Sequence, residues 1–130
     1  YVTPAETLSI WHRAVAERDA EAIAAILDPE VVLYSPVVHT PIRGSEMVMM
    51  YLRAASAILV NDSFSYVREI VGDSDAVLEF ACEIDGILVN GVDMFAFGNE
   101  GRITELKVMV RPLKAINLLH ERMAALLGPR

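Results

Sequence analysis

The order of hydrophobic patterns along the 130 residues predicts an α+β fold in a single domain, residues 1–130. Three observations support this prediction. The first sixty residues carry helical spacing on both sides of one short β-rich stretch. From Phe64 the apolar residues alternate with a period of two, as in antiparallel strands. After Pro112 the helical spacing returns, and no linker or repeat interrupts the chain.

Two helices are predicted at the start of the chain. Thr3-Pro4-Ala5-Glu6 indicates a helix start, because Thr3 can cap, proline suits the first helical position and Glu6 completes a capping box. Helical spacing then relates four apolar residues: Leu8, Trp11, Ala14 and Val15. Asp19 predicts the cap of a second, short helix, which Asp28-Pro29 should end.

A strand, a loop and a third helix should follow. Val31–Val38 is β-rich, and Pro36 within it favours an edge or a break in the strand. His39–Gly44 reads as a loop. From Ser45 a third helix is expected, with an apolar stripe formed by Met47, Val48, Tyr51, Leu52 and Ala55.

The next segments predict antiparallel strands. The first should place Phe64, Tyr66, Arg68 and Ile70 on one face. In Ala76–Ile84, Leu78, Phe80 and Cys82 alternate with Glu79 and Glu83, and Asp85-Gly86 is a hairpin turn. Val89–Pro112 predicts two further strands around the turn Gly98–Gly101. The last helix should carry Ile116, Leu119, Met123 and Leu126 and end at Gly128-Pro129.

Asp93 is the least expected residue in this pattern. It lies in the middle of a strand and shares a face with Phe95 and Phe97. A buried charge without a partner is costly, so such a carboxylate is usually paired, protonated or functional. Asp93 is therefore a candidate acid, base or ligand-orienting group. The alternative is a structural aspartate paired with a backbone amide or an arginine, such as Arg43 or Arg111.

Composition excludes several classes of partner. The net charge of −7 and the pI of about 4.8 argue against nucleic acid and anionic membrane as partners. No apolar run approaches the roughly 20 residues that span a bilayer, and the first residues lack a signal-peptide pattern. Cys82 is the only cysteine, so we expect a buried structural thiol and a reducing, cytoplasmic location.

The order of the motifs resembles a known superfamily. Three pieces carry the resemblance: Trp11–Pro36 with the break RDAEAIAAILDPEVVLYSP, the turn Pro41–Gly44 into a helix, and VDMFAFGNEGRITELKV. They resemble the nuclear transport factor 2-like superfamily, within it the SnoaL-like polyketide cyclase and ketosteroid isomerase branch. The resemblance implies a cone-shaped α+β barrel. In it N-terminal helices wrap a curved antiparallel or mixed sheet, a C-terminal helix follows, and a small apolar molecule is held inside, usually in a homodimer.

Site residues carry over only in part. The position of the branch's catalytic base matches Ser35, whose hydroxyl cannot act as a base near neutral pH. The position of its oxyanion-hole tyrosine matches Trp11, which can donate one hydrogen bond but has no phenol. The oxyanion-hole acid is retained at Asp93. Classical ketosteroid isomerase activity is therefore not expected, and whether the protein is an enzyme stays open.

The remaining candidates lie around the expected cavity. His39 could pair with Asp93 and move a proton, or it could be a solvated loop histidine. The candidate catalytic residues are thus Asp93 and His39. His12 and His120 are expected to be exposed or in dimer contacts. The candidate ligand-binding residues, which could equally be plain core, are Trp11, Tyr34, Ser35, Tyr51, Phe80 and Phe95.

These observations lead to two functional hypotheses. The first is binding of a small apolar or polycyclic molecule in the cavity, to which proton transfer of the isomerase, cyclase or dehydratase type could be added. The second is a non-catalytic ligand-binding or dimerisation module. No histidine or cysteine spacing indicates a metal site, and no cofactor is expected. A homodimer is expected through the second sheet face, which carries Glu79, Glu83, Met94, Lys107, Met109 and Arg111.

Overall fold

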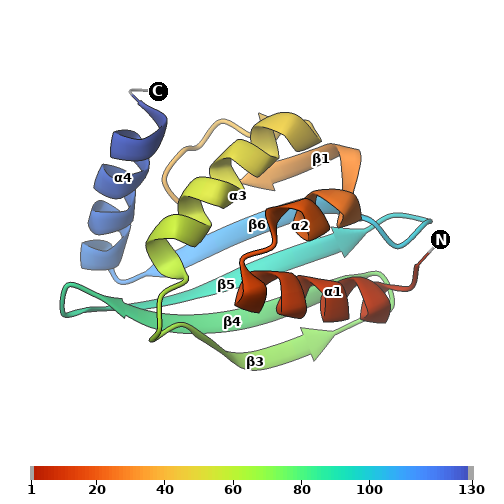
Figure 1. The fold of residues 1–130 in the computed structure, drawn as a ribbon, viewed down its shortest axis with the longest axis horizontal. Helices are drawn as coiled ribbons and strands as arrows, with labels where there is room; N and C mark the ends of the chain where they lie inside the picture. Colours follow the sequence, from red (N-terminus) through yellow and green to blue (C-terminus); the bar gives the residue numbers. More distant parts are fainter. Residues whose placement is uncertain (1, 129–130) are drawn as a thin grey trace.

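A computed structural model describes residues 2–128 and confirms the α+β prediction (Figure 1). One mixed sheet has the strand order β2-β1-β6-β5-β4-β3, and only β1 and β6 pair in parallel. The sheet is open, with β2 and β3 as its edges. The elements are α1 (Pro4–Glu17), α2 (Ala20–Ile26), β1 (Leu27–Tyr34), β2 (Ile42–Arg43), α3 (Ser45–Leu59), β3 (Ser65–Val71), β4 (Asp75–Ile84), β5 (Ile87–Phe97), β6 (Ile103–Arg111) and α4 (Leu113–Leu127).

The helices and the sheet form two layers with the core between them. Figure 1 shows α1, α2 and α3 in front of the sheet, with α4 beside α3 at one end. The inner sheet face is buried beneath these helices. The outer face leaves Ile70, Met94 and Met109 exposed. This is the face expected to form a dimer, and the homodimer stays a prediction.

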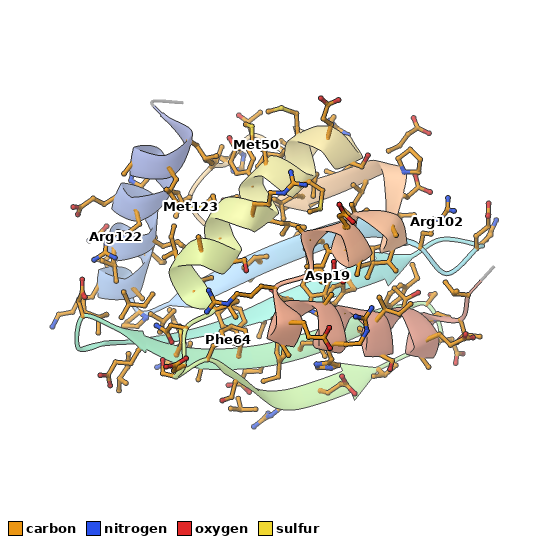
Figure 2. The ribbon with its side chains drawn as sticks, viewed as in Figure 1. Asp19, Met50, Phe64, Arg102, Arg122 and Met123 are labelled. Atoms are coloured by element: carbon orange, nitrogen blue, oxygen red, sulfur yellow. The ribbon has the colours of Figure 1, made fainter. Side chains whose placement is uncertain are left out.

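The starts of the first two helices follow their sequence signals. The Thr3 side chain accepts a hydrogen bond from the Glu6 backbone N–H at 3.1 Å, and the Thr3 N–H donates to Glu6 Oε1 at 3.3 Å. Asp19, which is labelled in Figure 2, accepts a hydrogen bond from the Ala22 N–H through its Oδ1 at 3.1 Å and caps α2. The capping box and the Asp19 cap are thus confirmed. Both helix starts could be predicted from the sequence because each cap involves residues only three positions apart.

The first strand was predicted with the wrong bounds. It begins directly after α2, includes Asp28-Pro29 and ends at Tyr34, rather than spanning Val31–Val38. Its pairing with β6 is irregular between Leu27 and Val32, so Pro29, which has no N–H, fits without breaking a regular ladder. The predicted loop at His39–Gly44 also contains the short strand β2, which pairs with β1.

The apolar stripes of α3 and α4 differ in detail from the prediction. Met47 was expected inside but is exposed, whereas Met49 is buried. Met49 is buried because α3 contacts α2, α4 and β1, so its buried arc is wider than one stripe. Met47 lies in the first turn of the helix. Leu126 on α4 is exposed, whereas Leu127 packs against the core, because the buried stripe of this helix runs through Ala115, Leu119 and Met123 at four-residue spacing. The predicted helix stop is confirmed at Gly128, which follows the last helical residue with a φ of 81°, and Pro129 lies outside the described residues.

A β-bulge in β3 overturns the predicted alternation of that strand. Tyr66 lies opposite Phe80, but Arg68 lies opposite Glu79, so Val67 is an extra residue in the ladder. Residues directly opposite each other share a face of the sheet. Tyr66 therefore faces the core with Phe80. Arg68 faces outward beside Glu79, and its Nε lies 3.4 Å from Glu79 Oε1. A strictly alternating strand would have placed both on one face.

The central strands agree with the sequence. Asp85 and Gly86 have φ angles of 51° and 79°, as the tight hairpin between β4 and β5 requires. Asp93 pairs with Leu78 on one side and Val108 on the other. Asp93, Phe95 and Phe97 are buried on the inner face, as predicted. A carboxyl group has therefore been placed in the centre of the sheet, beneath the helices.

Candidate functional site

A small cavity lies between the helices and the inner sheet face. Its volume is about 80 Å³. Most of its walls are apolar, and its polar side chains are Trp11, Ser56, Tyr66 and Asp93. The complete lining is Trp11, Val15, Ile23, Leu52, Ala55, Ser56, Leu59, Val60, Phe64, Tyr66, Phe80, Asp93, Leu106 and Val108. Helices α1 to α3 and strands β3 to β6 all contribute to it.

Asp93 is buried in this cavity without a cationic partner among the described residues. Its Oδ2 accepts a hydrogen bond from the Tyr66 hydroxyl at 2.9 Å. Burial raises the pKa of Asp93 to about 7, and the Tyr66 hydrogen bond, which lowers it, offsets part of that effect. Arg111, considered as an ion-pair partner, donates instead to Asn90 Oδ1 at 3.2 Å, and Arg43 is exposed. The carboxyl is thus held by a phenol, not by an arginine.

The hydrogen bonds around a charged Asp93 run in one direction, from Trp11 through Tyr66 to the carboxylate. The Trp11 indole N–H donates to the Tyr66 hydroxyl oxygen at 2.9 Å. An indole N–H can only donate, so the Tyr66 oxygen is the acceptor of that bond. The single phenolic proton of Tyr66 is then free to donate to Oδ2 of Asp93. As long as Oδ2 accepts that proton, Oδ1 is the oxygen left to carry a proton bound by Asp93 itself.

Tyr66 is the site residue that sequence reasoning missed. The sequence pattern placed it on one face with Arg68 and Ile70, and the bulge at Val67 lets it face inward without them. Its ring packs edge-on against His12 and Phe64, with ring centroids 5.1 Å away in each case. Burial, followed by the negative charge of Asp93, raises the pKa of Tyr66 far above its ordinary value. Tyr66 is therefore a neutral donor over the ordinary pH range.

Replacing Tyr66 by phenylalanine should raise the pKa of Asp93 further, because the lost hydrogen bond is one that lowers it. The variant also leaves the Trp11 N–H without its acceptor, which should cost about 1–3 kcal/mol of stability. A carbon-detected NMR titration of the Asp93 carboxyl measures the pKa. Tyr34→Phe is the matched control, since Tyr34 does not line this cavity. An Asp93 pKa that is unchanged or lower in Tyr66→Phe would contradict the assigned bond.

The other predicted residues are divided among several places. Trp11 and Phe80 line the cavity. Phe95 does not line it, but it supports Trp11 in an edge-on contact with centroids 5.0 Å apart. Tyr51 is buried and borders a hollow of about 170 Å³ beside α4. Its ring therefore belongs to the packing of α3 against α4.

The structure does not bring His39 to Asp93. His39 is exposed and lines a separate hollow of about 590 Å³, together with Tyr34 and Ser35. The hydroxyl of Ser35 accepts a bond from the Val37 N–H at 3.2 Å, within its own loop. The expected His39–Asp93 pair is thus absent from the described structure, because the strand ends at Tyr34 and the loop turns away from the cavity.

The remaining histidines fit their expected positions on helices. His12 lies 2.7 Å from Glu69 through its Nε2, and both side chains are partly exposed. His120 is exposed on α4. Among residues 2–128 no group of three His, Cys, Asp or Glu side chains is placed to hold a metal ion. In the same residues, no helix has the length and apolar character needed to cross a membrane.

An open sheet with helices over one face is a fold that this chain shares with solved nuclear transport factor 2-like proteins. The sequence model of the SnoaL-like domain matches residues 9–106, and the chain belongs to this family. A comparison with curated proteins finds no match.

Solved structures agree with that assignment. A steroid delta-isomerase from Pseudomonas aeruginosa is 33% identical to this chain, with a TM-score of 0.92. The match covers 98% of this chain and 93% of the isomerase chain. A protein with a cystatin-like fold from Silicibacter pomeroyi is 27% identical, with coverage of 92% and 83% and a TM-score of 0.85. A designed protein with a curved β-sheet shares the fold, at 19% identity and a TM-score of 0.72 over 91% and 94% of the two chains.

Proposed function

We propose that this protein binds a small, neutral, apolar molecule in the Asp93 cavity and holds its carbonyl oxygen with the protonated carboxyl of Asp93. The observation that carries this proposal is the directed chain of hydrogen bonds from Trp11 through Tyr66 to Asp93. That chain leaves Oδ1 as the oxygen that can bear a proton and donate it to a ligand. A carbonyl oxygen is the matching acceptor.

The walls of the cavity favour a neutral ligand. They are mostly apolar, and an anion placed beside Asp93 would be both desolvated and repelled. The volume of about 80 Å³ is smaller than the roughly 150 Å³ of an apolar cavity that holds benzene. The cavity therefore suits a carbonyl group and its neighbouring carbons. A polycyclic ligand would extend into the adjoining hollow of about 540 Å³, whose lining shares Val15, Val60, Phe64 and Tyr66 with the cavity.

Binding of a simple ketone tests the proposal. We expect 2-butanone to shift the NMR signals of residues lining the cavity, with an affinity that falls about tenfold per pH unit above pH 7, where Asp93 ionises. Asp93→Asn keeps a donor toward the ligand and should bind with no dependence on pH. Asp93→Ala removes the donor and should bind about tenfold more weakly. Binding of 2-butanone that is equal at pH 6 and pH 8.5 in the wild type would refute the role of Asp93.

Proton transfer of the isomerase type is a second candidate function. It is supported by the 33% identity to a steroid delta-isomerase and by a carboxyl whose pKa of about 7 suits acid–base catalysis at neutral pH. Asp93 would stabilise the enolate oxygen, but the lining of the cavity contains no second carboxylate or histidine to act as the base. Conversion of a β,γ-unsaturated ketone to its conjugated isomer, followed by ultraviolet absorption, distinguishes the candidates. Conversion that Asp93→Ala abolishes supports catalysis, and binding without conversion supports a binding module.

A further inference from the structure

The hollow beside His39 is a second cavity that the proposed function does not use. It lies between the loop after β1, the C-terminal half of β6 and α4. Its volume of about 590 Å³ falls within the range of small-molecule sites, roughly 300–1,000 Å³. Val108 is the one lining residue that it shares with the Asp93 cavity. A ligand here would therefore be separated from Asp93 by the strand β6.

The hollow exists because β1 ends before β6 does. Pairing of these two strands ends at Tyr34 and Lys107, whereas β5 continues to pair with β6 as far as Arg111. Four consecutive residues, Lys107–Val110, line the hollow. A strand face presents only alternate residues, so this lining is the edge of β6. The opposite wall includes Pro36 and Pro41, which have no N–H to donate to that edge.

The charge of the hollow is opposite to that of the protein. The chain has 18 acidic and 11 basic residues, yet no aspartate or glutamate lines this hollow. Lys107 does line it, with its ammonium 4.9 Å from the centre of the Tyr34 ring. Among the described residues no carboxylate lies within ion-pair distance of Lys107. His39 adds an imidazole, and Val38, Met109 and Ile116 add apolar surface.

From this arrangement we infer a second binding site, for a small apolar carboxylate such as a short fatty acid. The carboxylate would lie between the Lys107 ammonium and His39, where the open edge of β6 provides backbone groups for further hydrogen bonds. The hydrocarbon part would lie on Val38, Met109 and Ile116. The ligand is thus an anion, whereas the ligand proposed for the Asp93 cavity is neutral, so the two sites differ in chemistry.

The test is an NMR titration with hexanoate, and hexanamide serves as its neutral counterpart. We expect hexanoate to shift the amide signals of Val108–Val110 and to bind at least tenfold more tightly than hexanamide. Lys107→Met should remove that preference, and Lys107→Arg, which keeps the positive charge, should preserve it within about threefold. Asp93→Asn should leave hexanoate binding unchanged, because Asp93 does not line this hollow.

Three outcomes would overturn the inference. Equal binding of hexanoate and hexanamide would show that no cation selects the ligand. An unchanged affinity of Lys107→Met for hexanoate would show that the Lys107 ammonium does not bind the carboxylate. Shifts centred on Phe80 and Leu106, without shifts at Val108–Val110, would place the ligand in the Asp93 cavity instead. None of these results changes the expected binding of 2-butanone in the Asp93 cavity, so the test of the proposed function is independent of this one.

Discussion

Replacing Asp93 by asparagine should stabilise the protein at pH 8 by up to about 4 kcal/mol. The pKa of this carboxyl is raised from 3.8 to about 7 in the folded protein, because burial disfavours its charged form. Between these two values the folded state binds more protons than the unfolded state. The stability of the wild type therefore falls as the pH rises from about 4 to 7, and the loss is complete above pH 7.

Asparagine removes this penalty without removing the local geometry, because its amide oxygen can accept the hydrogen bond from Tyr66. Urea unfolding at two pH values measures the effect. At pH 4.5 the gain should shrink to about 1 kcal/mol, since the wild-type carboxyl is then mostly protonated when folded. The control is Asp62→Asn, an exposed carboxyl whose replacement should change stability by less than about 0.5 kcal/mol at either pH. A gain at pH 8 no greater than that at pH 4.5 would contradict the assigned pKa.

Truncating Phe80 to alanine should cost about 3–5 kcal/mol of stability. Its side chain is 2% exposed, stacks on Phe64 with ring centroids 5.5 Å apart and meets Tyr66 edge-on. It lies across the sheet from Gly91, where an added Cβ would come within 2.4 Å of the Phe80 ring. Because Gly91 has no side chain, it cannot fill the space that the Phe80 ring leaves.

The same substitution should change which ligands bind, because Phe80 lines the Asp93 cavity. Removing its ring enlarges a cavity that now holds about 80 Å³, so cyclohexanone should bind Phe80→Ala more tightly than the wild type. Urea unfolding and an NMR titration measure the two effects. Ile70→Ala is the control, since this exposed side chain on the outer face should cost less than about 0.5 kcal/mol and leave binding unchanged. Unaltered ketone selectivity in Phe80→Ala would show that the ring does not limit the cavity.

Sequence reasoning succeeded where the interactions are local. The caps at Thr3 and Asp19 and the hairpin at Asp85-Gly86 depend on residues within three positions of each other, and all were found in the structure. The burial of Asp93 with Phe95 and Phe97 followed from the period of a regular strand. These features require no knowledge of what packs against the segment.

Errors arose where a neighbouring element decided the outcome. Met47 was placed inside because it fits the helical spacing, but it is exposed in the first turn of α3. Met49 was left out of the stripe, but it is buried because α3 contacts several elements. The strand β1 begins at Leu27 because the irregular pairing with β6 accommodates Pro29. Neither partner is visible from the local sequence, so propensity alone gave the wrong residue and the wrong bounds.

The candidate site shows the same division. The chain's own pattern determined the α+β order, the family resemblance and the position of one carboxyl on a buried strand face. Only the tertiary structure decided what that carboxyl contacts. A single extra residue at Val67 turns Tyr66 toward Asp93, and the early end of β1 sends His39 to a different hollow. Strand register and loop direction are set by pairing between distant segments, and that pairing is what a local pattern leaves open.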